Sequence, residues 1–136
     1  MTRRTVLPLI AAVTLGALAA CDGLFERERA VLLPVQTVVA PATFTPGQAF
    51  TVTATVVSGG CRSFERLDGA REGDRITLLA RGREVSGPDV ACPADVRYEP
   101  RTYTVQPPFG DSIVVTAAQP AGLAPVSQVV RRPPAG

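Results

Sequence analysis

The sequence predicts an all-β protein, an antiparallel β-sandwich of about six or seven short strands. Three observations indicate this fold class. Beyond residue 21, no long segment repeats its apolar residues with the 3.6-residue period of a helix. Several short runs alternate apolar and polar residues or are rich in β-branched residues. The 13 Pro and 12 Gly separate these runs at intervals typical of turns.

The first 20 residues have the pattern of a secretory signal. Arg3 and Arg4 precede an uncharged, mainly apolar run over residues 5–20, which ends in small residues. The run is shorter than the roughly 20 apolar residues that span a bilayer, and Pro8 interrupts it. We therefore expect residues 1–20 to be a signal peptide rather than a transmembrane helix.

The end of this segment, Leu18-Ala19-Ala20-Cys21, resembles the lipobox of bacterial lipoproteins. The resemblance covers about residues 3–21. It implies cleavage before Cys21, lipidation of Cys21, and anchoring through that lipid on the non-cytoplasmic side of a bacterial membrane, inner or outer. Two or three acyl chains make such anchoring stable. The alternative is an ordinary signal cleaved near Ala20, with Cys21 left as a free thiol.

The remaining chain divides into a tether, a domain and a tail. Residues 21–30 form the lipidated N-terminus and a solvated tether with charges of alternating sign. We expect residues 31–132 to form the β-sandwich and residues 133–136 to be a disordered tail. The first run, residues 31–40, should be an edge strand bent or split at Pro34, because proline cannot donate to a sheet.

The clearest strand covers residues 50–56. Phe50, Val52, Ala54 and Val56 alternate with Thr51, Thr53 and Thr55, so the apolar set should face the core and the threonines should face water. A threonine row can bind ice or sugar. Threonine is also a good β-former that suits the solvent-exposed side of a strand, and this is the interpretation we prefer.

Four further strands are expected. They are residues 74–80, residues 96–105 with a break at Pro100, residues 112–118 and residues 126–130. Domain length and strand number resemble those of immunoglobulin-like modules. The resemblance stops there, because the chain has no Trp for the usual core position, and no specific family is indicated.

Two cysteines remain once Cys21 is assigned to lipid. In an exported protein, Cys61 and Cys92 should form a disulfide, worth roughly 3–4 kcal/mol for a separation of this length. The bridge either joins two sheets or clips a loop to a strand, and the neighbouring Gly60 and Pro93 favour the clip. A metal or redox site is the weaker alternative, because the chain has no His and no Cys-x-x-Cys.

Residues 61–73 are polar and should form a surface loop. Phe64 and Leu67 are its only large apolar residues. They either pin the loop to the sandwich or act as anchors for a binding partner.

The charge pattern and the missing residue types exclude several functions. Beyond residue 20, twelve Arg balance twelve Asp and Glu, which speaks against nucleic-acid binding. The absence of His and Lys excludes Ser-His-Asp, Cys-His, Ser-Lys and Schiff-base chemistry within the chain. Carboxylates remain, as Glu65 with Asp68, or Asp68 with Glu72 and Asp74. The neighbouring arginines make surface ion pairs the simpler explanation, and the spacing matches no EF-hand.

The leading hypothesis is a non-enzymatic lipoprotein domain without cofactor or metal. It would contact another envelope protein or the cell wall through the predicted loop 61–73, with Phe64 and Leu67 as anchors. The alternative is a domain that binds a small ligand, a glycan or a metal. A third hypothesis is an enzyme that uses Asp68 and Glu72.

Overall fold

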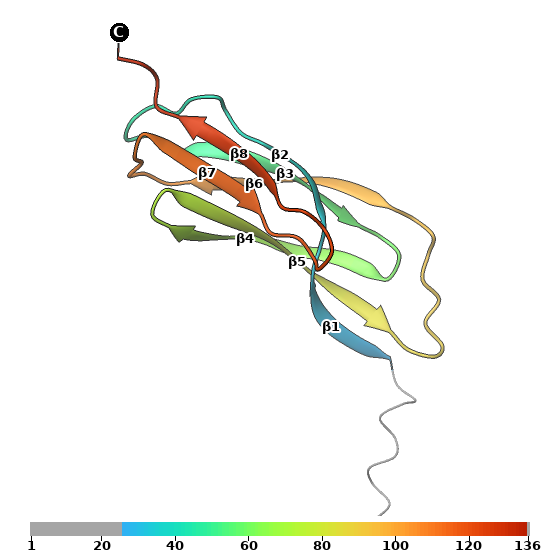
Figure 1. Cartoon of the computed structure of the whole chain (residues 1–136). Helices are drawn as coiled ribbons and strands as arrows, with labels where there is room; N and C mark the ends of the chain where they lie inside the picture. The colour runs from blue at the N-terminus through green and yellow to red at the C-terminus, as the bar shows by residue number, and fades with distance from the viewer. Residues whose placement is uncertain (1–25, 136) are drawn as a thin grey trace, which may run out of the picture.

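The computed structural model describes residues 26–135 and shows eight strands in that range, without a helix (Figure 1). The predicted signal peptide and Cys21 lie outside the described residues. Within residues 26–135 no helix is long and apolar enough to cross a membrane. The strands are β1 (Arg27–Leu32), β2 (Val35–Val39), β3 (Phe50–Ser58), β4 (Arg62–Glu72), β5 (Arg75–Ser86), β6 (Arg97–Val105), β7 (Ser112–Ala117) and β8 (Val126–Arg131).

The strands form two sheets, which lie one behind the other in Figure 1. One sheet has the order β1-β5-β7-β8, with β4 paired to β5 as well, and the other has the order β2-β3-β6. The predicted β-sandwich is confirmed. Its strand number is eight rather than six or seven, and one pair, β5 with β7, is parallel rather than antiparallel.

The core consists of the inward-facing residues of both sheets. On β3, β5 and β7 every second side chain is fully or almost fully buried: Val52, Ala54, Val56, Ile76, Leu78, Ala80, Ile113, Val115 and Ala117. Burying one Val or Leu side chain contributes about 1.5–3 kcal/mol. The period-two patterns expected for residues 50–56 and 74–80 are therefore confirmed.

Pro34 divides the first predicted strand, as expected, and the two halves join different sheets. β1 pairs with β5, whereas β2 pairs with β3. β1 begins at Arg27, earlier than the predicted start of the domain. Residues 27–30 therefore pair with β5 instead of forming a free tether, and Arg29 forms an ion pair with Glu84.

The prediction of a loop over residues 61–73 is wrong, because Arg62–Glu72 is a strand paired with β5 along its length. β4 lies at the edge of its sheet and is polar on its outer side. The register also shifts between Phe64 and Arg66, which breaks the period-two pattern. Because of these two features, the sequence of β4 lacks the regular alternation of apolar and polar residues that predicts a strand.

Two other elements differ from the prediction. β5 continues to Ser86, so the irregular segment between β5 and β6 covers residues 87–96 only. β6 passes through Pro100 without a break, and Pro100 pairs with Thr55. β6 is an edge strand, where a residue without an N–H is tolerated.

The predicted disulfide between Cys61 and Cys92 is present, with a Cα–Cα distance of 4.9 Å. Cys61 immediately precedes β4, and Cys92 lies in the irregular segment 87–96. The bridge therefore clips this segment to the turn between β3 and β4. The Gly60 N–H supports the same contact by donating to the backbone and side-chain oxygens of Asp95, each at 3.0 Å.

Replacing both cysteines, Cys61→Ala with Cys92→Ala, should lower the free energy of unfolding by about 3–4 kcal/mol. The cause is the extra freedom of the unfolded chain once the 31-residue separation is no longer bridged. Urea unfolding measures the change. Ser86→Ala, at the exposed end of β5, is the control and should shift stability by less than about 0.5 kcal/mol. A loss no larger than that of the control would contradict the assigned role.

Candidate functional site

The outer face of the three-stranded sheet is the most distinctive surface of the molecule. Burial of Val52, Ala54 and Val56 turns the alternate residues of β3 outward. These are Thr51, Thr53, Thr55 and Val57. The threonines predicted to face water therefore do so, as one row along the middle strand of the sheet.

The neighbouring strands extend this row into an array. Antiparallel pairing places Thr104 beside Thr51 and Thr102 beside Thr53. On the other side, the Thr37 hydroxyl donates to the Thr55 hydroxyl at 3.0 Å. We call this surface the threonine face. It consists of Thr37, Val39, Thr51, Thr53, Thr55, Val57, Tyr98, Pro100, Thr102 and Thr104.

Within residues 26–135, no charged side chain belongs to the threonine face. The charges of β6 are on its other side, because Glu99 and Arg101 alternate with Tyr98, Pro100 and Thr102. Glu99 accepts a hydrogen bond from the Ser58 hydroxyl and pairs with Arg101. Both groups therefore lie at the margin between the two sheets.

The carboxyl group of Glu99 is held in its charged form by these neighbours. The hydrogen bond from Ser58 is the largest cause, and it lowers the pKa of Glu99. Desolvation acts in the opposite direction, and Arg101 and Arg97 lower the pKa further. The contacts with Ser58 and Arg101 therefore favour the carboxylate form of Glu99.

Phe64 and Leu67, the predicted partner anchors, are half-buried and pack against the core. The Arg101 guanidinium lies 4.4 Å from the centroid of the Phe64 ring. The structure thus places both side chains on the inner side of β4, where they pin that strand to the sandwich.

On the outer face of the other sheet, the part formed by β1, β4 and β5 carries ion pairs. Arg83 lies 3.2 Å from both Glu28 and Glu65, and Asp68 lies 3.1 Å from Arg66 and 2.7 Å from Arg81. Arg81 is the largest cause of the lowered pKa of Asp68. Exposed pairs of this kind add little to stability, because water and salt screen them.

Three of the carboxylates considered for catalysis have partners of their own. Arg66 lies 3.7 Å from Glu65 and 3.1 Å from Asp68 and bridges the two, whereas Asp74 accepts a hydrogen bond from the Gly110 N–H at 3.0 Å. Among residues 26–135, no group of three or more His, Cys, Asp or Glu residues could hold a metal ion.

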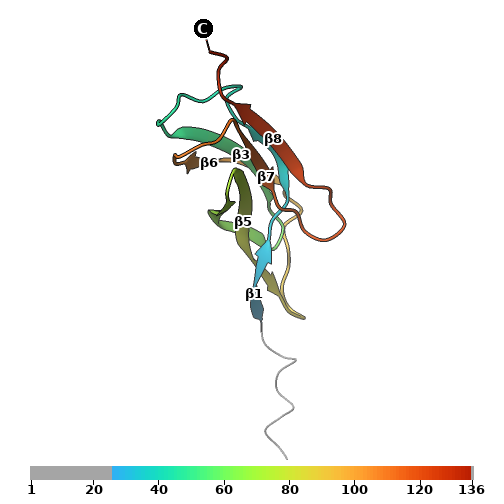
Figure 2. The ribbon, with the colours of Figure 1, turned by 60° about the vertical axis from the view of Figure 1, so that its left-hand side comes forward.

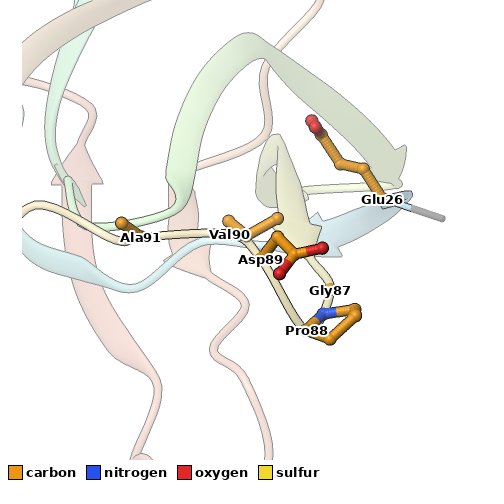
Figure 3. A pocket seen from close by; sticks show the side chains of 6 residues that line it. All are labelled: Glu26, Gly87, Pro88, Asp89, Val90 and Ala91. Carbon is orange, nitrogen blue, oxygen red and sulfur yellow. The ribbon is translucent and has the colours of Figure 1, made fainter. Parts of the chain in front are cut away.

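Two open hollows lie at opposite ends of the sandwich. One, of about 470 Å³, lies between Glu26 and residues 87–91 (Figure 3). The other, of about 670 Å³, is lined by Arg71, Asp74 and Phe109 among others. Arg71 is already bound to the backbone oxygens of Gly73, Gln106 and Pro108. The polar groups at this second hollow hold the loops together.

The chain matches no protein family, no curated protein and no solved structure. Its function must therefore be inferred from its own residues.

The threonine row of β3 could be predicted from the sequence, but the row on β6 was not predicted. The alternation of Thr102 and Thr104 with Tyr103 and Val105 was a usable signal, but their position beside β3 depends on strand pairing.

The lowered pKa of Glu99 predicts a pH-dependent stability. A carboxyl group whose pKa is lower in the folded state stabilises the fold above its unfolded pKa, and this contribution disappears as the pH falls through the folded pKa. Glu99→Gln should therefore be less stable than the unmodified chain near pH 7. It should also lose less stability than that chain as the pH falls below the ordinary pKa of a glutamate.

Urea unfolding at a series of pH values measures this difference. Glu72→Gln, at the exposed end of β4, serves as the control and should leave the acid-dependent loss unchanged. Parallel curves for Glu99→Gln and the unmodified chain would show that the contacts of Glu99 with Ser58 and Arg101 do not stabilise the fold.

Proposed function

We propose that this protein is a membrane-anchored bacterial lipoprotein whose β-sandwich is a non-enzymatic binding module of the cell envelope. The binding surface is the threonine face, and the partner is another envelope protein or a wall polymer. The observation that carries this proposal is the array of six threonines in neighbouring rows on an uncharged sheet face.

The anchor is inferred from the sequence. The segment Leu18-Ala19-Ala20-Cys21 resembles a lipobox, and Cys21 lies only five positions before Glu26. A chain of this length reaches at most about 18 Å. The described chain begins at the end of the sandwich opposite the C-terminus (Figures 1 and 2). Lipid on Cys21 would hold this end close to the membrane and leave the threonine face accessible beside it.

Exposed apolar side chains support the choice of the threonine face. Val39 and Tyr98 belong to it and are 62% and 59% exposed. Val96, which is 63% exposed, immediately precedes β6. A partner gains free energy by covering such groups. Removing water from hydroxyl groups costs less free energy than removing it from charged groups. The desolvation cost of this face is therefore lower than that of the ion-paired face.

A binding role fits the chemistry better than an enzymatic role. Cys61 and Cys92 are joined, the chain has no His or Lys, and Asp68 is paired with Arg66 and Arg81. The functional groups of the threonine face are hydroxyls without a neighbouring acid or base on that face, within the described part of the chain. Threonine hydroxyls form hydrogen bonds, and the phenol of Tyr98 is the one group in this set of residues whose type takes part in proton transfer.

The proposal can be tested by photocrosslinking of the native lipoprotein in its own envelope. A photoreactive residue at Thr53, in the middle of the threonine face, should capture one recurrent partner. The same residue at Ala70, which is exposed on β4 of the other sheet, is the matched control and should capture nothing above background. Equal capture at both positions would contradict the assigned binding face.

The anchor is tested in the same experiment. Cys21→Ser should remove the lipid mass from the N-terminal peptide, release the protein from the membrane fraction and reduce capture at Thr53. Cys61→Ser with Cys92→Ser should keep the lipid and the membrane association. Persistent membrane association of Cys21→Ser would overturn the lipoprotein assignment.

A further inference from the structure

We infer that the partner of the threonine face is a neutral polysaccharide, bound as an extended chain along β3 and β6. This inference rests on the proposed function and specifies the class of its partner. It depends on four properties of the face: its hydroxyl chemistry, its lack of charge, its shape and the position of Tyr98.

The hydroxyl groups of the face match those of a sugar. Each threonine hydroxyl donates one hydrogen bond and accepts two, and its hydrogen can rotate to suit the partner. Sugar hydroxyls have the same dual character, so the two arrays can pair in many registers. Threonine is also restricted at χ1. The face therefore loses little side-chain entropy when it is covered.

Among the residues that the structure describes, the threonine face has no charged member, and this excludes an ionic partner. A phosphate or carboxylate placed on this face would lose hydration without gaining a cation in return. The charges of β6 are on the other side of the strand, where Arg101 is paired with Glu99 and Arg97 is paired with Asp95. A neutral polymer avoids this cost.

The shape favours a chain over a folded protein. Nine residues of β3 extend over about 30 Å, and three strands spaced about 4.8 Å apart give a width of about 10 Å. The face is therefore a strip about three times as long as it is wide, and an extended chain covers such a strip more fully than a globular protein does.

The face is also poorly suited to packing against another sheet. Sheets that pack face to face interdigitate apolar side chains, but six of the ten residues here are threonines. Neighbouring strands are rotated by roughly 20°, so the rows do not form a planar lattice of the kind that ice would require. A flexible polymer can follow this twist.

Tyr98 supplies a second kind of sugar contact. It lies on β6 beside Val57, with Pro100 next along the same side of the strand. Its exposed ring offers a flat apolar surface to the C–H face of a sugar ring, and its hydroxyl can bind a sugar oxygen. Along β6, the threonine face therefore has an aromatic ring near the start of the strand and threonine hydroxyls toward its end.

The test uses the full-length lipoprotein in detergent micelles, with insoluble cellulose, chitin and neutral wall polysaccharide purified from the host as probes. At least one probe should retain the protein, and raised salt should not release it, because no ionic contact is involved. Tyr98→Ala should weaken retention about tenfold, whereas Tyr98→Phe should keep most of it.

Two matched double variants locate the site. Thr53→Val with Thr102→Val removes a cross-strand pair of hydroxyls from the threonine face. Thr77→Val with Thr116→Val removes a cross-strand pair from the other sheet. The first variant should lose about tenfold in affinity and the second less than about twofold. Melting temperatures confirm that both variants are folded.

The outcomes separate this inference from the proposed function. Retention that survives Thr53→Val with Thr102→Val would overturn the inference. Retention by none of the three probes, together with capture of a protein from position 53, would also overturn it and leave the binding role intact. Retention by none of the probes and no capture from position 53 would defeat both.

Discussion

The burial of one side of β3 against the inner face of the other sheet is the constraint on which the rest of the structure depends. Val52, Ala54 and Val56 share the core with Ile76, Leu78 and Ala80. Successive side chains of a strand point to opposite faces, so burying this set fixes Thr51, Thr53 and Thr55 outside. A register slip of one residue would exchange the two sets and destroy both the core and the threonine face.

The same alternation places the charged side chains of β6 on one side of the strand and the uncharged side chains on the other. Arg97, Glu99 and Arg101 take one side of the strand, and Tyr98, Pro100 and Thr102 take the other. The edge strand thereby keeps its threonine face uncharged and places Glu99 and Arg101 at the margin between the sheets. Inward-pointing charges and a proline also discourage pairing with strands of other molecules. The alternation on β6 thus disfavours pairing of this edge strand with other molecules and keeps the threonine face uncharged.

Strongly periodic strands could be predicted from the sequence, and strands with mixed signals could not. Residues 50–56 and 74–80 alternate cleanly, and their inward residues were identified. β4 was missed because of the register shift after Phe64 and the polar outer side of an edge strand. The disulfide could be predicted because the signal-like segment indicates export, and because assigning Cys21 to lipid leaves two cysteines to pair. The array on the threonine face could not, because a single sequence does not reveal that Thr102 pairs with Thr53.

The most direct test of the central claim is the thiol reactivity of single cysteines introduced along β3 of the full-length protein, with the unmodified chain as the baseline. Thr53→Cys and Thr55→Cys should react with a maleimide at least about tenfold faster than Val52→Cys and Ala54→Cys, since buried positions react only when the fold opens. Equal rates along the strand, or faster reaction at positions 52 and 54, would contradict the alternation from which the threonine face arises.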